Sequence, residues 1–161
     1  MRYLTIAIVL GFTLPVWADS APEDYLDKGN LKAALEVSDL QGGFAGFNGN
    51  IWRVQTDGSI TAVKTVVRKE EVMYQGKLSK QQVEALAKDL AKYDLANLKS
   101  EGKPMANPHA VTIKWGKDSR TLNLTAGAAL PKADAKSVEG RYAGIVEAVR
   151  ALGQKGKEKE K

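Results

Sequence analysis

The chain has no cysteine and a single histidine, His109, among its 161 residues. The absence of cysteine excludes both a disulfide framework and a lipid-modified N-terminal cysteine. A zinc site with one histidine would need three carboxylate or water ligands, which is unusual. No Gly-x-Ser-x-Gly motif marks a nucleophilic serine, and no Asp-x-Asp-x-Asp-Gly sequence marks a calcium loop. We therefore predict no catalytic residue, no cofactor and no metal, and interpret His109 as a strand-end or loop residue.

The chain also lacks an apolar run of the ~20 residues that a membrane-spanning helix needs. The apolar run at 3–14 follows Arg2 and precedes Ala18. A charged start, a short apolar stretch and a small residue at a cleavage site are typical of a secretory signal peptide. We predict a signal peptide over 1–18, cleavage after Ala18, a periplasmic or extracellular protein and no membrane span. A buried N-terminal helix is the alternative interpretation.

Positive charge is concentrated outside the expected domain. The chain carries 24 basic and 19 acidic residues, but one of the basic residues lies in the signal peptide and four lysines lie in 153–161. That last segment has no apolar side chain to bury, so we predict a disordered lysine-rich tail. The remainder is close to neutral and does not favour nucleic acid as a partner. We expect a loose polar segment over 19–30 and a single domain over 31–152.

The first half of the domain has the patterns of three strands. Apolar and polar residues alternate over 31–38, and 51–56 and the segment after Asp57–Gly58 also read as strands. Asp57–Gly58 favours a two-residue hairpin turn. That turn fixes a register and places one row of side chains on the core face: Trp52, Val54, Thr61 and Val63. The charged run 68–77 is predicted to be a loop.

The second half has the pattern α-β-β-α. Ser79 and Gln82 have the spacing of a capping box, which predicts a helix over about 80–93. A second hairpin over 110–124 and a last helix over about 137–152 follow. The order β-β-β-α-β-β-α predicts an α+β fold, with one mostly antiparallel sheet of about five strands and both helices covering one face.

The segment 42–50 has an unusual composition for a solvated turn, because four glycines accompany two phenylalanines. It does not match a phosphate-binding loop, since it continues into a predicted strand rather than into Gly-Lys-Ser and a helix. One interpretation is a hairpin loop or bulge in which Phe44 and Phe47 fold back onto the sheet. The other is an exposed apolar loop that faces a partner, because aromatic side chains are common interface anchors.

Paired carboxylates can perform glycosidase chemistry, which requires one of them to have a raised pKa. The candidates Asp39, Glu70, Glu71 and Glu101 all stand in polar, loop-like surroundings. We interpret them as solvated surface residues and predict that the protein is not an enzyme.

The Gly-Gly-Phe-Ala-Gly sequence at 42–46 resembles a signature near the start of the emfourin family, small protein inhibitors of thermolysin-type metallopeptidases. The order of predicted elements from Leu31 to Leu152 is similar to that family as well. The resemblance implies a secreted metallopeptidase as partner and an inhibitory function. The predicted partner-binding residues are Gly42, Gly43, Phe44, Ala45, Gly46 and Phe47. The alternative is a structural or interaction module of the cell envelope that has no inhibitory activity.

Overall fold

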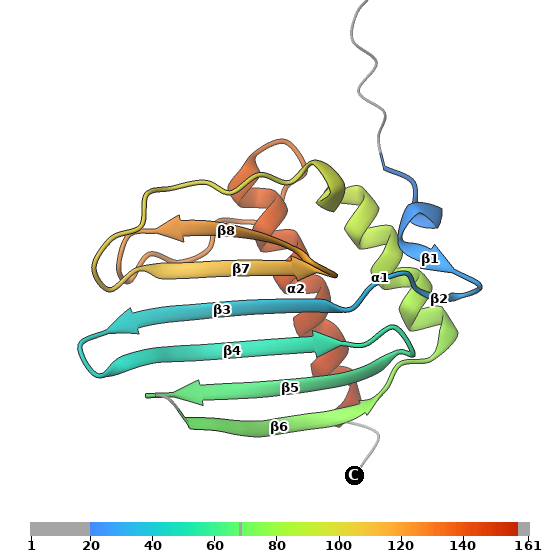
Figure 1. Cartoon of the computed structure of the whole chain (residues 1–161), viewed down its shortest axis with the longest axis horizontal. Coiled ribbons are helices and arrows are strands. Elements are labelled where there is room, and N and C mark those ends of the chain that lie inside the picture. Colours follow the sequence, from blue (N-terminus) through green and yellow to red (C-terminus); the bar gives the residue numbers. More distant parts are fainter. Residues whose placement is uncertain (1–19, 68, 158–161) are drawn as a thin grey trace, which may run out of the picture.

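The computed structural model describes residues 20–67 and 69–157, and its side chains as far as Gly153 (Figure 1). The predicted signal peptide, 1–18, and the last four residues of the predicted tail lie outside the described residues. None of the described helices is long and apolar enough to cross a membrane.

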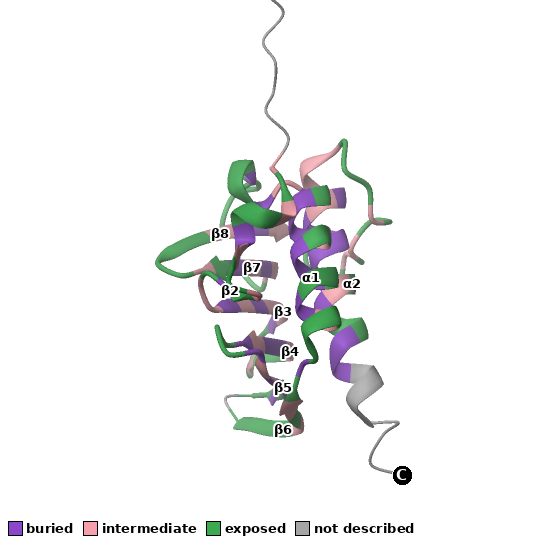
Figure 2. Cartoon of the chain, turned by 90° about the vertical axis from the view of Figure 1, so that its right-hand side faces the viewer, coloured by how far each residue is buried: buried purple, intermediate pink, exposed green. Residues whose placement is uncertain are grey.

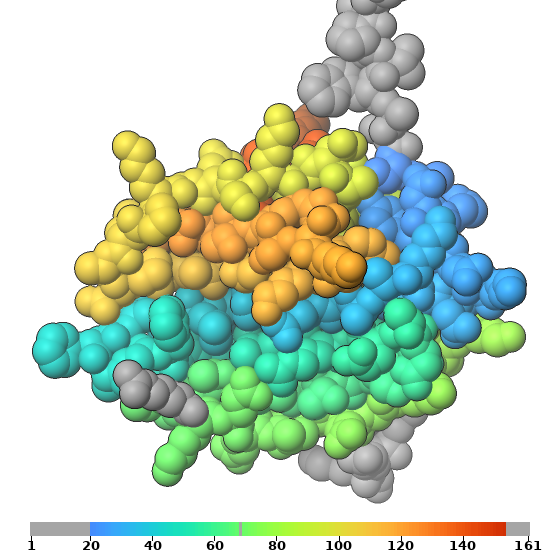
Figure 3. Space-filling view, in the orientation of Figure 1, coloured from blue at the N-terminus to red at the C-terminus, as the bar shows by residue number. Residues whose placement is uncertain are grey.

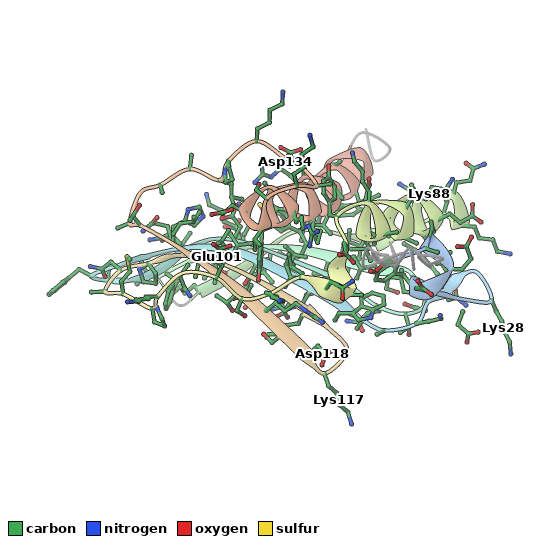
Figure 4. All side chains as sticks on the ribbon, turned by 90° about the horizontal axis from the view of Figure 1, so that it is seen from above. Lys28, Lys88, Glu101, Lys117, Asp118 and Asp134 are labelled. Atoms are coloured by element: carbon green, nitrogen blue, oxygen red, sulfur yellow. The ribbon has the colours of Figure 1, made fainter. Side chains whose placement is uncertain are left out.

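The fold is α+β, as the sequence predicts. Its main sheet is antiparallel, with the strand order β6-β5-β4-β3-β7-β8. The strands are β3 (Leu35–Gly43), β4 (Gly46–Val54), β5 (Ser59–Val66), β6 (Lys69–Lys77), β7 (His109–Trp115) and β8 (Asp118–Leu124). The helices are α1 (Lys80–Lys92) and α2 (Val138–Lys157), with a short 3-10 turn, η2 (Leu95–Asn97), after α1. Figures 2 and 4 show both helices on one side of the sheet.

The strand count differs from the prediction, because the main sheet has six strands rather than about five. The additional strand is β6, Lys69–Lys77, which lies within the run 68–77 that we expected to be a loop. This strand lies at the edge of the sheet. Charged side chains are common on edge strands, where they discourage pairing with other chains. The same charges hide the strand from a search for apolar alternation.

The N-terminal segment is ordered from Ser20 onward, contrary to the prediction of a loose 19–30. It forms a 3-10 turn, η1 (Pro22–Tyr25), and a small hairpin of β1 (Leu26–Asp27) and β2 (Asn30–Leu31). Tyr25 is buried with its ring edge-on to Trp115 at 5.6 Å, and its hydroxyl accepts a hydrogen bond from the Ala96 amide. The strand predicted from Leu31 therefore starts only at Leu35, after the small hairpin.

The turn between β4 and β5 explains why the predicted register of these two strands is wrong. Gln55 N donates to Ser59 O and Gly58 N donates to Gln55 O, with Gly58 at φ +83°. This is a three-residue loop that ends in a left-handed glycine, not the predicted two-residue turn. Val54 therefore pairs with Ile60, and Trp52 with Ala62. The extra residue moves Thr61 and Val63 to the face opposite the helices.

The helices agree with the prediction at three of their four ends. Ser79 caps α1 and shares a capping box with Gln82, and α2 begins at Val138, one residue after the expected start. However, α2 continues to Lys157, so the first part of the predicted disordered tail is helical. Gly153 is buried, and a side-chain carbon at that position would lie 3.5 Å from the Trp52 ring. Gly153 thus lies within reach of the sheet, next to Trp52, where the sequence predicted the helix to have ended.

The core lies between the sheet and the two helices. Its largest fully buried side chains include Leu35, Ile60, Leu86, Ile113 and Tyr142, which come from both layers. The opposite face of the sheet is turned toward the viewer in Figure 3, and no described helix covers it. This face carries ion pairs between Glu36, Arg53, Glu70 and Lys114. The sheet is thus half-buried, a common arrangement for antiparallel sheets.

Candidate functional site

The β3–β4 hairpin forms the most exposed apolar feature of the described chain. Its ladder continues to the pair Gly43 and Gly46, so only Phe44 and Ala45 remain as the turn. Phe44 is 107% exposed and Phe47 is 47% exposed. The interpretation in which both rings fold back onto the sheet is therefore wrong. In Figure 3 the hairpin projects beyond the neighbouring segments at one end of the molecule.

Other exposed apolar residues lie in the segments that adjoin this hairpin on either side. The amide of Val67, in the turn between β5 and β6, donates to the Phe47 carbonyl at 3.0 Å, and Val66 is its chain neighbour. On the other side, the Gly42 amide donates to the Pro108 carbonyl, in the loop that also carries Met105. We define the tip surface as the exposed residues Phe44, Phe47, Val66, Val67 and Met105. Among the described large apolar residues that are exposed, Val72 alone lies outside it.

The glycines of the hairpin divide into two kinds. A side-chain carbon at Gly42 would lie 2.9 Å from the Pro108 ring, and one at Gly49 would overlap the backbone of Asp39 and Leu40. A carbon at Gly43 would meet nothing closer than a carbonyl oxygen at 3.5 Å. Glycine is therefore required by close backbone contacts at positions 42 and 49. Gly43 and the phenylalanines have no such structural reason.

Hydrogen bonds hold the base of the hairpin to two loops. Gln41 Nε2 donates to the Asn107 carbonyl at 3.3 Å, and Gln41 Oε1 accepts from the Gly127 amide at 3.0 Å. One side chain of β3 thus joins the loop before β7 to the loop after β8. The tip surface stands on a connected base rather than on a free loop.

A charged cluster lies beneath this base, on the helix side of the sheet. His109 Nε2 is 2.6 Å from Asp39 Oδ1, and Arg150 Nη2 donates to Asp39 Oδ2 at 3.3 Å. The other histidine nitrogen, Nδ1, contacts the Ala128 carbonyl. Asp39, His109 and Arg150 border an open hollow of about 370 Å³ beside α2. His109 is the first residue of β7 and is buried, which agrees with its prediction as a strand-end residue.

The cluster does not have the arrangement of a catalytic dyad. A histidine base must keep one ring nitrogen open to the nucleophile while the other contacts the carboxylate. In His109 both nitrogens face oxygen atoms of the protein. Among the described residues, no three histidine, aspartate or glutamate side chains are grouped as a metal site would require.

Three of the four carboxylates that we expected in loop-like surroundings lie in strands. Asp39 belongs to β3 and its side chain is 16% exposed, while Glu70 and Glu71 belong to β6. Glu101 lies outside the strands but forms a bridge to Leu122 of β8. Glu70 accepts both arms of the Arg53 guanidinium at 3.1 Å, which lowers its pKa. A carboxylate with a lowered pKa is a poor general acid.

The ion pair between Arg53 and Glu70 is extended by Glu36 of β3, which also contacts Lys114 of β7. Burial alone would raise the pKa of Glu36, but hydrogen bonds from Lys114 and Arg53 lower it overall. The network crosses the open face of the sheet from β7 to β6.

Comparison of the sequence with protein-family models and with curated proteins found no match. The six residues predicted to bind a partner, 42–47, lie together at the hairpin tip. Sequence reasoning missed Val66, Val67 and Met105, which the strand order brings to the same end. Two adjacent valines before a charged run are the one sequence signal for part of this surface.

Proposed function

We propose that this is an exported, non-enzymatic binding protein whose interface is the tip surface. The observation that carries the proposal is Phe44, a large aromatic side chain that is completely exposed at the end of a paired hairpin. Burying one such side chain in a partner contributes about 1.5–3 kcal/mol. Its surroundings are apolar, which suits a protein partner better than a nucleic acid.

The backbone of the hairpin supports this role. Binding through a flexible loop costs free energy, because the loop must be ordered in the complex. Both sequence-based interpretations make the glycine-rich segment a loop, but its ladder pairs residues up to Gly43 and Gly46. Only two residues remain unpaired, so the ordering cost on binding is small.

The charged groups support a non-catalytic role. His109 has an oxygen neighbour at each ring nitrogen, and Asp39 is shared between His109 and Arg150. Glu36 and Glu70 are both paired with Arg53. These side chains stabilise the sheet and its loops, and none of them is poised for proton transfer.

The specific activity that we propose is inhibition of a secreted thermolysin-type metallopeptidase. The sequence that resembles the emfourin signature, 42–46, occupies the tip itself and projects beside other exposed apolar residues. A paired hairpin can enter the active-site cleft of a peptidase without the loss of conformational entropy that a flexible loop would undergo. The alternative is an envelope module that binds a partner through the same surface without inhibition.

The experiment is a titration of the mature protein, residues 19–161, against a panel of secreted metallopeptidases. We expect stoichiometric inhibition of at least one of them. Truncating the second aromatic residue, Phe47→Ala, should weaken that inhibition by more than it destabilises the protein, because about half of the residue is already buried before a partner binds. Binding without inhibition would favour the envelope module, and an unchanged inhibition constant in Phe47→Ala would remove this residue from the interface.

A further inference from the structure

A separate hollow of about 240 Å³ lies between the end of α2 and strands β4, β5 and β6. The sheet contributes Trp52 and Ala62 to its walls, and α2 contributes Arg150 and Gly153. Its volume is below the range of about 300–1,000 Å³ that is common for drug-sized ligands. The hollow therefore suits a small molecule or the end of a chain.

A β-bulge shapes one wall of this hollow. Ala62 pairs with Tyr74 and Val63 pairs with Val72, which leaves Met73 as an extra residue in β6. Successive residues of a regular strand face opposite sides of the sheet. Met73 and Tyr74 nevertheless both line the hollow. In a regular strand only one of these two side chains would face the hollow, so the bulge adds the apolar side chain of Met73 to its wall. Bulges are frequent beside active sites, where they redirect a side chain.

Two of the lining residues offer hydrogen-bond donors to a ligand. Arg150 provides a guanidinium with five N–H groups, and the side-chain amide of Asn50 can donate as well. No carboxylate is present among the described lining residues. Arg150 uses one long hydrogen bond, 3.3 Å, to Asp39, and its side chain is 44% exposed.

Arg150 is only partly committed to its ion pair. Its Nη2 lies 3.3 Å from Asp39 Oδ2, while Asp39 Oδ1 faces His109 at 2.6 Å, so this contact does not use the other N–H groups of the guanidinium. In the strand register Lys64 lies beside Asn50 and Glu71 lies beside Lys64, and both of these charged side chains are exposed to solvent. A guanidinium over an indole ring, here 5.8 Å from the centroid of Trp52, is held beside an apolar wall.

We infer that this hollow binds a small monocarboxylate with an apolar body. Arg150 would take the carboxylate, because a guanidinium and a carboxylate form paired hydrogen bonds. Trp52, Ala62 and Met73 would contact the apolar body. A phosphate, which carries about two charges, would leave one charge uncompensated against these apolar walls. The ligand could be a free acid or the C-terminal residue of a peptide, since the two present the same chemistry.

The test is isothermal titration of the mature protein with hexanoate, N-acetyl-leucine and N-acetyl-leucinamide, with tryptophan fluorescence, to which Trp52 and Trp115 contribute, as a second readout. We expect at least one acid to bind and the neutral amide to bind at least about tenfold more weakly, a difference of ~1.4 kcal/mol. Hexanoate alone would identify a free acid, and N-acetyl-leucine alone would identify a peptide C-terminus. Equal binding of acid and amide, or no binding of either acid by the wild-type protein at millimolar concentration, would overturn the inference.

Three variants locate the site. Arg150→Gln should remove the preference for the acid over the amide, and Arg150→Lys should restore part of it. Gly153→Leu keeps the charge but places a side chain toward the Trp52 ring, so it should abolish binding. The matched control is Arg141→Gln, because Arg141 lies on the same helix but pairs with Asp94. An acid affinity that stays unchanged in both Arg150→Gln and Gly153→Leu would also contradict the site. Phe44→Ala should leave acid binding unchanged, so this site and the tip surface are tested independently.

Discussion

Replacing single glycines of the β3–β4 hairpin should separate structural from functional positions. Gly49 has φ +156°, and a side-chain carbon there would lie 2.9 Å from Leu40 Cα and closer still to the Asp39 carbonyl. A backbone conformation that disfavours other residues costs about 1–3 kcal/mol, and overpacking adds about 1–3 kcal/mol. Because the atoms in the way are backbone, they cannot move aside cheaply. We therefore expect Gly49→Ala to destabilise the protein by about 2–5 kcal/mol.

The matched control is Gly43→Ala in the same hairpin. A carbon at Gly43 would be in ordinary contact, 3.5 Å from the Gly46 carbonyl oxygen, and the residue is exposed. Its stability should change by no more than about 0.5 kcal/mol. Urea unfolding of both variants, followed by circular dichroism, measures the difference. Similar unfolding midpoints for Gly49→Ala and the wild-type protein would refute the close backbone contact from which the hairpin geometry is derived.

Two further predictions concern the sheet network and the helix contact. Glu36 has a lowered pKa in the folded state, so its ionised form stabilises the protein above the unfolded pKa and this contribution is lost as the pH falls. Glu36→Gln should therefore lower the free energy of unfolding by about 1 kcal/mol at pH 7. This difference between the variant and the wild-type protein should vanish progressively below about pH 5. An equal difference at all pH values in thermal melts would contradict this. A side-chain carbon at Gly144 of α2 would overlap the buried ring of Tyr93. Gly144→Ala should therefore destabilise the protein by about 1–3 kcal/mol, although alanine has a higher helix propensity than glycine. A gain in the urea midpoint would show that this contact is looser than described.

The sequence predicts those helices and turns that are determined by hydrogen bonds between neighbouring residues. Ser79 and Gln82 define the start of α1 through hydrogen bonds within four residues, and the turn between β7 and β8 is equally short. The prediction of the register between β4 and β5 is wrong because one residue of loop length decides it. The Asp57–Gly58 pair is compatible with a two-residue and with a three-residue loop. Strand β6 was missed because its charges follow from its place at the edge of the sheet, which is known only once the strand order is known.

The candidate site divides in the same way. Residues 42–47 are contiguous, so their composition marks them in the sequence. Val66, Val67 and Met105 join them only through pairing between distant segments, as do Asp39, His109 and Arg150 beneath the hairpin. The prediction ended α2 too early because the burial of Gly153 next to Trp52 depends on tertiary packing, which no pattern around Gly153 indicates.

The most direct test of the tip surface is to compare binding and stability in Phe44→Ala. Affinity for each peptidase of the panel and the urea midpoint are measured for wild-type protein, Phe44→Ala and Val72→Ala. Val72 is the matched control, because it is 58% exposed on β6 but lies outside the tip surface. We predict that Phe44→Ala weakens binding by ~2 kcal/mol or more, roughly 30-fold, that Val72→Ala does not, and that neither variant changes the midpoint. Binding by Phe44→Ala equal to that of the wild-type protein would contradict the account.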